Sequence, residues 1–124
     1  MENETVYIAP GGRHSIVREE GDVVRIALND FPPENGCRPA VDVLFRSAAQ
    51  VYGGRQLGII LTGMGSDGTL GAKELKSKGV PIIVQDKESS VVWGMPGSAV
   101  NAHVADEVAP LMLIPGVVER MILG

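Results

Sequence analysis

The sequence has 124 residues, of which 44% are hydrophobic, and a formal net charge of −4. This length suits one small domain with a core of its own, and the acidic balance argues against a nucleic-acid partner. The single cysteine, Cys37, excludes an internal disulfide and a multi-cysteine zinc site. The sequence has no signal peptide, and its apolar runs are far shorter than the about 20 residues that a membrane helix needs. It therefore favours a cytoplasmic protein without membrane insertion.

The first third of the chain is expected to form strands and turns. Residues 6–9 are typical of a short strand, which the following Pro-Gly-Gly turn ends. Residues 14–19 and 23–28 predict a β-hairpin around a Gly-Asp turn, because apolar and polar side chains alternate in the second of them. Prolines and a glycine make residues 30–39 a loop.

The remainder alternates helical patterns with short apolar runs. Apolar residues at helical spacing predict a helix over 40–52, which Gly53-Gly54 ends. Further along the chain we expect a strand, a helix, a second strand and two short helices, at residues 57–61, 69–78, 80–84, 97–102 and 114–122.

Residues 57–84 predict a strand–helix–strand unit. Its two apolar runs are continuous, which is typical of strands covered on both faces of a parallel sheet, and such strands are joined by a right-handed crossover. The expected fold class is α/β, with a doubly wound, mostly parallel, Rossmann-like three-layer sheet and a β-hairpin near the start. In such sheets the loops after the strands carry the chemistry, here residues 62–68 and 85–96.

The first of these loops supports two interpretations. Gly63-x-Gly65-x-x-Gly68 matches the dinucleotide fingerprint, with Asp86 near the expected position of a ribose-binding acid. However, Asp67 would put a carboxylate beside the pyrophosphate. In the second interpretation Asp67 is the functional group and orients a histidine, as the acid of a hydrolytic triad does.

A structural role for the acids is also open. Asp67 is well placed to cap the helix predicted at 69–78 through its backbone N–H groups. Asp42 is expected to cap or orient the first turn of the helix predicted at 40–52.

Other reactive side chains have weaker cases. Ser66 lacks the first glycine of a nucleophile elbow, and Cys37 lies in a proline-rich loop. His14 follows a turn, where a packing role is more usual than that of a base, and His103 is expected at the surface. Trp93 is expected to pack the loop before Met95-Pro96.

Four motifs in order resemble one family, the chemotaxis protein-glutamate methylesterases. Residues 60–68, Ile-Leu-Thr-Gly-Met-Gly-Ser-Asp-Gly, look like the family's signature loop. The segment 7–11 with His14, the helix start at 38–45 and the loop 85–96 are similar to three further family motifs, with Ala40 where the family usually has Ser.

The resemblance implies a function. The family hydrolyses γ-glutamyl methyl esters on methyl-accepting chemotaxis receptor helices and deamidates receptor glutamines, with a Ser-His-Asp triad and with no cofactor or metal. The triad acid falls on Asp67. The backbone amide of Met64, between Gly63 and Gly65 in the active-site loop, is the expected oxyanion donor.

The chain also departs from the family pattern. The nucleophile lies in a Gly-x-Ser-Thr-Gly-Gly turn and the base in a Gln-His segment, and neither motif occurs here. We therefore expect residues 1–124 to be the C-terminal portion of a catalytic domain, incomplete on its N-terminal side and inactive alone. Its expected partners are the missing N-terminal segment and a receiver domain. The alternative is a non-catalytic nucleotide- or receptor-binding module that uses the glycine loop.

Overall fold

The computed structural model describes all 124 residues. Its elements in chain order are β1 (His14–Glu20), β2 (Val23–Asn29), α1 (Val41–Tyr52), β3 (Gly58–Ile60), α2 (Thr69–Ser77), β4 (Ile82–Gln85), α3 (Gly94–Asn101), β5 (Glu107–Ala109), the 3₁₀ turn η1 (Leu111–Leu113) and α4 (Ile114–Leu123). None of these helices is both long and apolar enough to span a membrane.

The chain forms two sheets, the β1–β2 hairpin and a three-stranded parallel sheet in the order β3-β4-β5. Ile59 pairs with Ile83, and Ile83 with Glu107, so the predicted parallel arrangement of the two apolar runs is confirmed. The strand β5 was not predicted; it has three residues and buries only Ala109.

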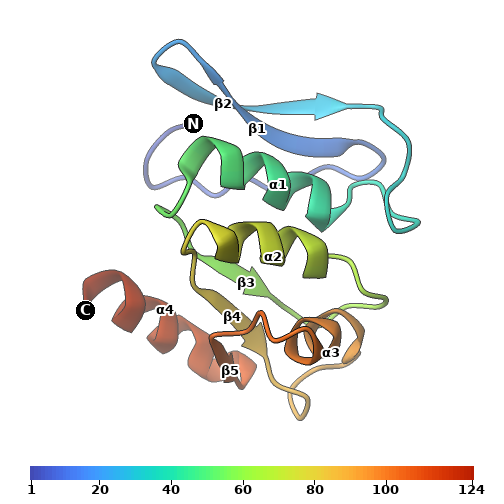
Figure 1. The fold of residues 1–124 in the computed structure, drawn as a ribbon, viewed down its shortest axis with the longest axis vertical. Helices are drawn as coiled ribbons and strands as arrows, with labels where there is room; N and C mark the ends of the chain where they lie inside the picture. The colour runs from blue at the N-terminus through green and yellow to red at the C-terminus, as the bar shows by residue number, and fades with distance from the viewer.

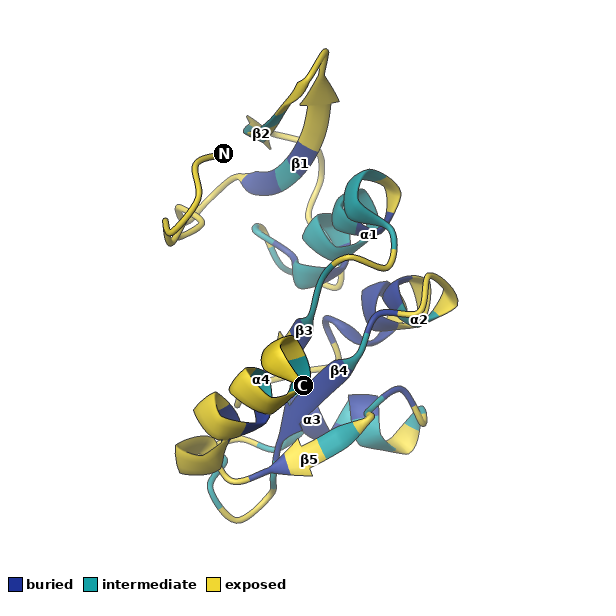
Figure 2. Cartoon of the chain, turned by 90° about the vertical axis from the view of Figure 1, so that its left-hand side faces the viewer, coloured by how far each residue is buried: buried dark blue, intermediate teal, exposed yellow.

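Helices cover both faces of this sheet, as the predicted three-layer fold requires. Figures 1 and 2 show α2 and α3 on one side and α4 on the other. Neighbouring residues of β4 point to opposite sides: Ile82 and Val84 belong to a core that includes residues of α1, α2 and α3, whereas Ile83 packs with residues of α4. This alternation explains why β4 is apolar throughout.

The expectation that both apolar runs are covered on both faces is wrong for the first of them. Ile59 and Leu61 are 38% and 44% exposed, because α4 packs over Leu57, just before β3, and not over Ile59 or Leu61. β3 also forms one edge of the sheet and has no partner on its outer side. The sheet is thus open at its β3 edge.

The predicted strand at residues 6–9 is not formed. Val6 and Ile8 are 87% and 89% exposed, and no backbone of the chain pairs with this segment. A strand needs a hydrogen-bonded neighbour, so a short apolar run alone does not produce one.

The predicted hairpin is present and packs on α1. β1 and β2 pair antiparallel through a two-residue loop, where Gly21 has a φ of 62° that suits glycine. The Val17 N–H donates to the Ser47 hydroxyl across 3.0 Å. The helix α1 therefore lies between the hairpin and α2 (Figure 1), which brings its N-terminus to the loop after β3.

Candidate active site

The loop after β3 is held by the loop that follows β4. The Gly63 N–H donates to the Val92 carbonyl at 3.1 Å, and the Gly63 carbonyl accepts the Met95 N–H at 2.8 Å. Gly94 allows this close approach, because a Cβ there would lie 2.8 Å from the Gly63 carbonyl oxygen. The backbone of the glycine loop is therefore fixed at the carboxyl edge of the sheet.

Met64 lies at the exposed tip of this loop. It is 80% exposed, and its N–H donates to no atom of the chain. Gly65 next to it has a φ of 81°, which a residue with a side chain adopts with strain. The loop thus has one backbone donor without a partner in the chain.

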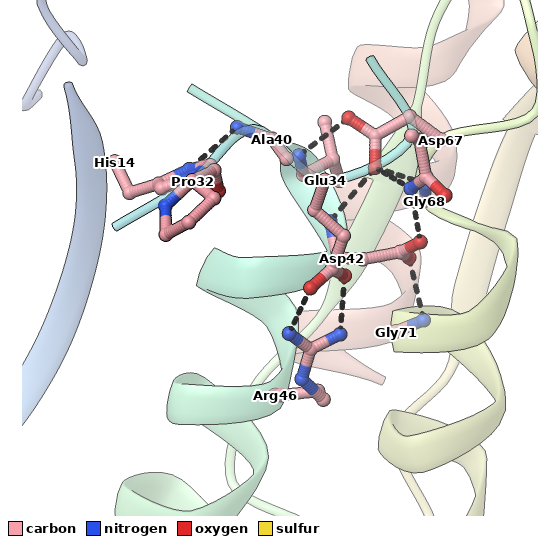
Figure 3. Close-up of polar contacts among 11 residues, drawn as sticks. His14, Pro32, Glu34, Ala40, Asp42, Arg46, Asp67, Gly68 and Gly71 are labelled. Atoms are coloured by element: carbon pink, nitrogen blue, oxygen red, sulfur yellow. Dashed lines mark hydrogen bonds and ion pairs between the residues drawn. The ribbon is translucent and has the colours of Figure 1, made fainter. Parts of the chain in front are cut away.

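The Asp67 side chain is buried and caps a helix, but not the one expected. Its Oδ2 accepts the Val41 N–H at 2.6 Å, and its Oδ1 accepts the N–H groups of Asp42 and Gly68, each at 3.0 Å. Val41 begins α1, so Asp67 caps α1 from a loop far along the chain (Figure 3). The residue before α1, Ala40, offers no side-chain cap, and Asp67 supplies one.

The Asp42 side chain completes an exchange of caps between two helices. It does not cap its own helix as expected: its Oδ1 accepts the Gly71 N–H, in the first turn of α2, at 2.7 Å (Figure 3). The exchange needs a close crossing, and Gly71 provides it, since a Cβ there would lie 2.5 Å from the Cβ of Phe45. Asp67 thus faces the partially positive N-terminus of α1, and Asp42 faces that of α2, so each carboxylate stabilises the start of a helix.

Sequence analysis missed Asn35, whose amide joins the two acids. Its Nδ2 donates to Asp42 Oδ2 at 2.8 Å and to Asp67 Oδ1 at 3.0 Å. Asn35 and Gly36 have φ angles of 56° and 73°, as in a type I′ turn. The Asn-Gly pair is the signal that predicts such a turn, although not what its side chain reaches.

A bidentate ion pair holds the same turn on α1. Arg46 donates to the two carboxylate oxygens of Glu34 at 2.5 and 2.6 Å (Figure 3). Hydrogen bonds from Arg46 lower the pKa of Glu34 below its ordinary value of 4.5, more than burial raises it. The pair ties residue 34 to the helix that Asp67 caps.

This pair predicts a pH dependence of stability. Because the pKa of Glu34 is lower in the folded chain, the pair stabilises the fold above about pH 4.5 and loses this effect as the pH falls through the lowered pKa. Both side chains are partly exposed, so we expect less than about 1 kcal/mol. In urea unfolding from about pH 7 to about pH 3, the stability difference between wild type and Glu34→Gln should shrink. A difference that stays constant would contradict this assignment.

His14 is a buried packing residue, as the sequence favoured. Its Nδ1 accepts the Ala40 N–H at 3.2 Å, so this nitrogen is unprotonated, and its Nε2 donates to the Pro32 carbonyl at 2.9 Å. With both nitrogens engaged and only 1% exposure, His14 has no hydrogen bond to Asp67 and no free nitrogen for a base.

The other reactive candidates do not assemble into a triad. Ser66 and His103 are exposed, and Cys37 donates to the Asn35 carbonyl. Asp86 accepts the N–H and hydroxyl of Ser89, which is a local turn. No group of three or more His, Cys, Asp or Glu side chains has an arrangement that could hold a metal ion.

Comparisons with known proteins identify the family of this chain. Residues 1–118 match the family described as CheB methylesterase. The chain belongs to this family. It is 54% identical over 105 residues to a CheB-family relative, a protein-glutamate methylesterase/protein-glutamine glutaminase of Trichodesmium erythraeum (strain IMS101), and the match covers 85% of this chain and 30% of that protein.

Two further CheB-family proteins are also similar over most of this chain. A protein-glutamate methylesterase/protein-glutamine glutaminase of Geobacillus kaustophilus (strain HTA426) is 47% identical over 123 residues, which are 98% of this chain and 35% of that protein. The crystal structure of the Thermotoga maritima CheB methylesterase catalytic domain is similar with a TM-score of 0.90 at 40% identity, over 93% of this chain and 61% of that one. The chain thus spans about a third of the length of the curated relatives it matches.

Proposed function

We propose that this chain supplies the acid and the oxyanion donor of a receptor methylesterase. The complete enzyme would hydrolyse glutamate γ-methyl esters and deamidate glutamines on methyl-accepting chemotaxis receptors, in the cytoplasm. Residues 1–124 would be the C-terminal part of its catalytic domain, and a preceding segment would contribute the nucleophilic serine and the histidine. A receiver domain is the expected further partner.

The state of the Asp67 carboxylate carries this proposal. Each carboxylate oxygen has two lone pairs, which more than two donors can share. Oδ1 accepts three N–H groups, whereas Oδ2 accepts only the Val41 N–H. Oδ2 therefore has room for one more donor, and an imidazole N–H would fill it.

The reaction would follow the serine-hydrolase scheme. The serine Oγ attacks the ester carbonyl while the histidine takes its proton, and Asp67 holds the histidine tautomer and stabilises the imidazolium. The free N–H of Met64 would stabilise the negative oxygen of the tetrahedral intermediate. The histidine then returns the proton to the leaving methanol, and water releases glutamate by the same steps in reverse.

Exposed apolar side chains near the loop support a helical substrate. Met64, Val91 and Met112 are 80%, 91% and 86% exposed, and each follows the carboxyl end of one strand of the sheet. An amphipathic receptor helix could bury such side chains around the scissile ester.

The nucleotide-binding alternative receives less support from the geometry. A pyrophosphate on the glycine loop would need the first N–H groups of α2. The Gly71 N–H already donates to the Asp42 carboxylate, and Asp67 adds a second negative charge next to Gly68. A dinucleotide would have to displace one carboxylate and tolerate the other.

Methanol release from methylated receptor tests the proposal. We expect none from the chain alone, and turnover when it is joined to a family segment that contains Gly-x-Ser-Thr-Gly-Gly and Gln-His. Turnover by the unjoined chain that survives Asp67→Asn but not His14→Ala would overturn the assignment. A joined protein that binds receptor without turnover would favour the non-catalytic alternative, and an increase in Tm with NAD or FAD would favour nucleotide binding.

A further inference from the structure

The turn at Glu34–Cys37 is built to aim one side chain. The N–H and carbonyl of Glu34 pair with those of Cys37 at 3.0 and 2.9 Å, which closes the turn. The ion pair between Glu34 and Arg46 then fixes the turn on α1. With the backbone held at both points, the Asn35 amide is directed at the two capping acids.

Two carboxylates that share one hydrogen-bond donor need that donor. Asp42 and Asp67 are 1% and 5% exposed, so little water screens the repulsion between them. The Asn35 amide gives one hydrogen to each, and both contacts identify the amide nitrogen, since a carboxylate only accepts. Without this amide, the acids would face each other with one donor fewer on each.

We propose that Asn35 is a positioning residue for Asp67: its amide is a third donor to Oδ1, so that the carboxylate is held with Oδ2 as the oxygen that meets the histidine. This inference rests on the proposed function. A displacement of a catalytic group by about 1 Å can lower a rate on the order of 10²-fold, so a lost positioning contact has a measurable effect.

Two variants in the joined enzyme separate the side chain from the turn. Asn35→Gly keeps the positive φ that the turn requires and removes the amide, whereas Asn35→Asp keeps the shape and adds a third carboxylate. We expect kcat to fall about 10- to 100-fold in Asn35→Gly and further in Asn35→Asp, with KM for methylated receptor nearly unchanged. The matched control is Asp22→Gly in the hairpin turn, which should leave kcat unchanged.

A double-mutant cycle identifies the route of the effect. If Asn35 acts through Asp67, Asn35→Gly should cause no further loss of kcat in the Asp67→Asn background. In the unjoined chain, hydrogen exchange at the amides of Val41 and Asp42 should be faster in Asn35→Gly, because these amides donate to the carboxylate that loses its support.

The outcomes distinguish this inference from the proposed function. If Asp67→Asn leaves kcat unchanged, the proposed function fails. If Asp67→Asn lowers kcat but Asn35→Gly lowers only Tm, or if the two losses of kcat are additive, the positioning role is wrong and Asp67 keeps its assignment. Should Asn35→Gly fail to fold, Asn35→Asp, which keeps the shape of the side chain, tests whether the N–H donor is required: a kcat equal to that of the wild type would overturn the positioning role.

Discussion

Replacement of Asp67 by Asn is expected to lower kcat of the joined enzyme by up to about 10⁴-fold, because an amide cannot hold the histidine in the tautomer that accepts the serine proton. The measurement is the initial rate of methanol release at saturating methylated receptor, with Tm recorded for the same preparations. A fall in kcat at unchanged KM would identify a group that acts in the transition state.

The same substitution should also lower stability, contrary to what the sequence suggests. Asn usually caps a helix nearly as well as Asp. Here both oxygens of Asp67 accept N–H groups, so an amide nitrogen would face either the Val41 N–H or the three donors on Oδ1. One buried donor left unsatisfied costs about 1–3 kcal/mol.

Asp106→Asn is the matched control for this loss of stability. Asp106 Oδ2 accepts the Ile82 N–H at 2.8 Å and Oδ1 accepts the Lys76 ammonium at 2.7 Å, at the edge of the sheet opposite the glycine loop. The variant should lower Tm and leave kcat unchanged. Equal losses of kcat in Asp67→Asn and Asp106→Asn would mean that Asp67 acts only through stability.

Gly71→Ala is expected to destabilise the fold where α1 crosses α2. The new Cβ would lie 2.5 Å from the Phe45 Cβ and 3.1 Å from the Asp42 Cα, so the helices would have to separate. Such overpacking costs about 1–3 kcal/mol, and the better helix propensity of Ala returns only about 0.5–1 kcal/mol. Urea unfolding of the two proteins measures the difference.

The control for Gly71→Ala is Gly116→Ala in the first turn of α4. A Cβ at Gly116 would meet nothing within 4 Å, so this variant should gain about 0.5–1 kcal/mol. If both variants were equally stabilised, the close crossing would not matter to the fold. If Gly71→Ala is destabilised as expected, kcat of the joined enzyme should fall too. The hydrogen bonds of Asp67 to α1 and of Asp42 to α2 form where the two helices cross, so a wider crossing would disturb them.

The parts of the fold that the sequence predicted depend on local pattern. The apolar runs at 57–61 and 80–84, with a helix between them at crossover spacing, allow one arrangement, and the parallel pair β3–β4 is that arrangement. The second strand begins later than predicted, at Ile82, because the Val80 N–H donates to Leu75 and Pro81 has no N–H. Residues 6–9 have the same kind of pattern, yet without a neighbouring strand they form none.

By itself the sequence determined the family, the strand–helix–strand unit and the loop that holds Asp67, since each depends on a pattern of residues that are close together in the sequence. Only the tertiary structure decided which helix Asp67 caps, that Asp42 caps α2 in return, and that the Asn35 amide donates to both acids. These contacts link residues 25 to 32 positions apart, for Asp67 with Asp42, Val41 and Asn35. No local pattern encodes them, because they exist only once the crossing of α1 and α2 brings both helix N-termini together.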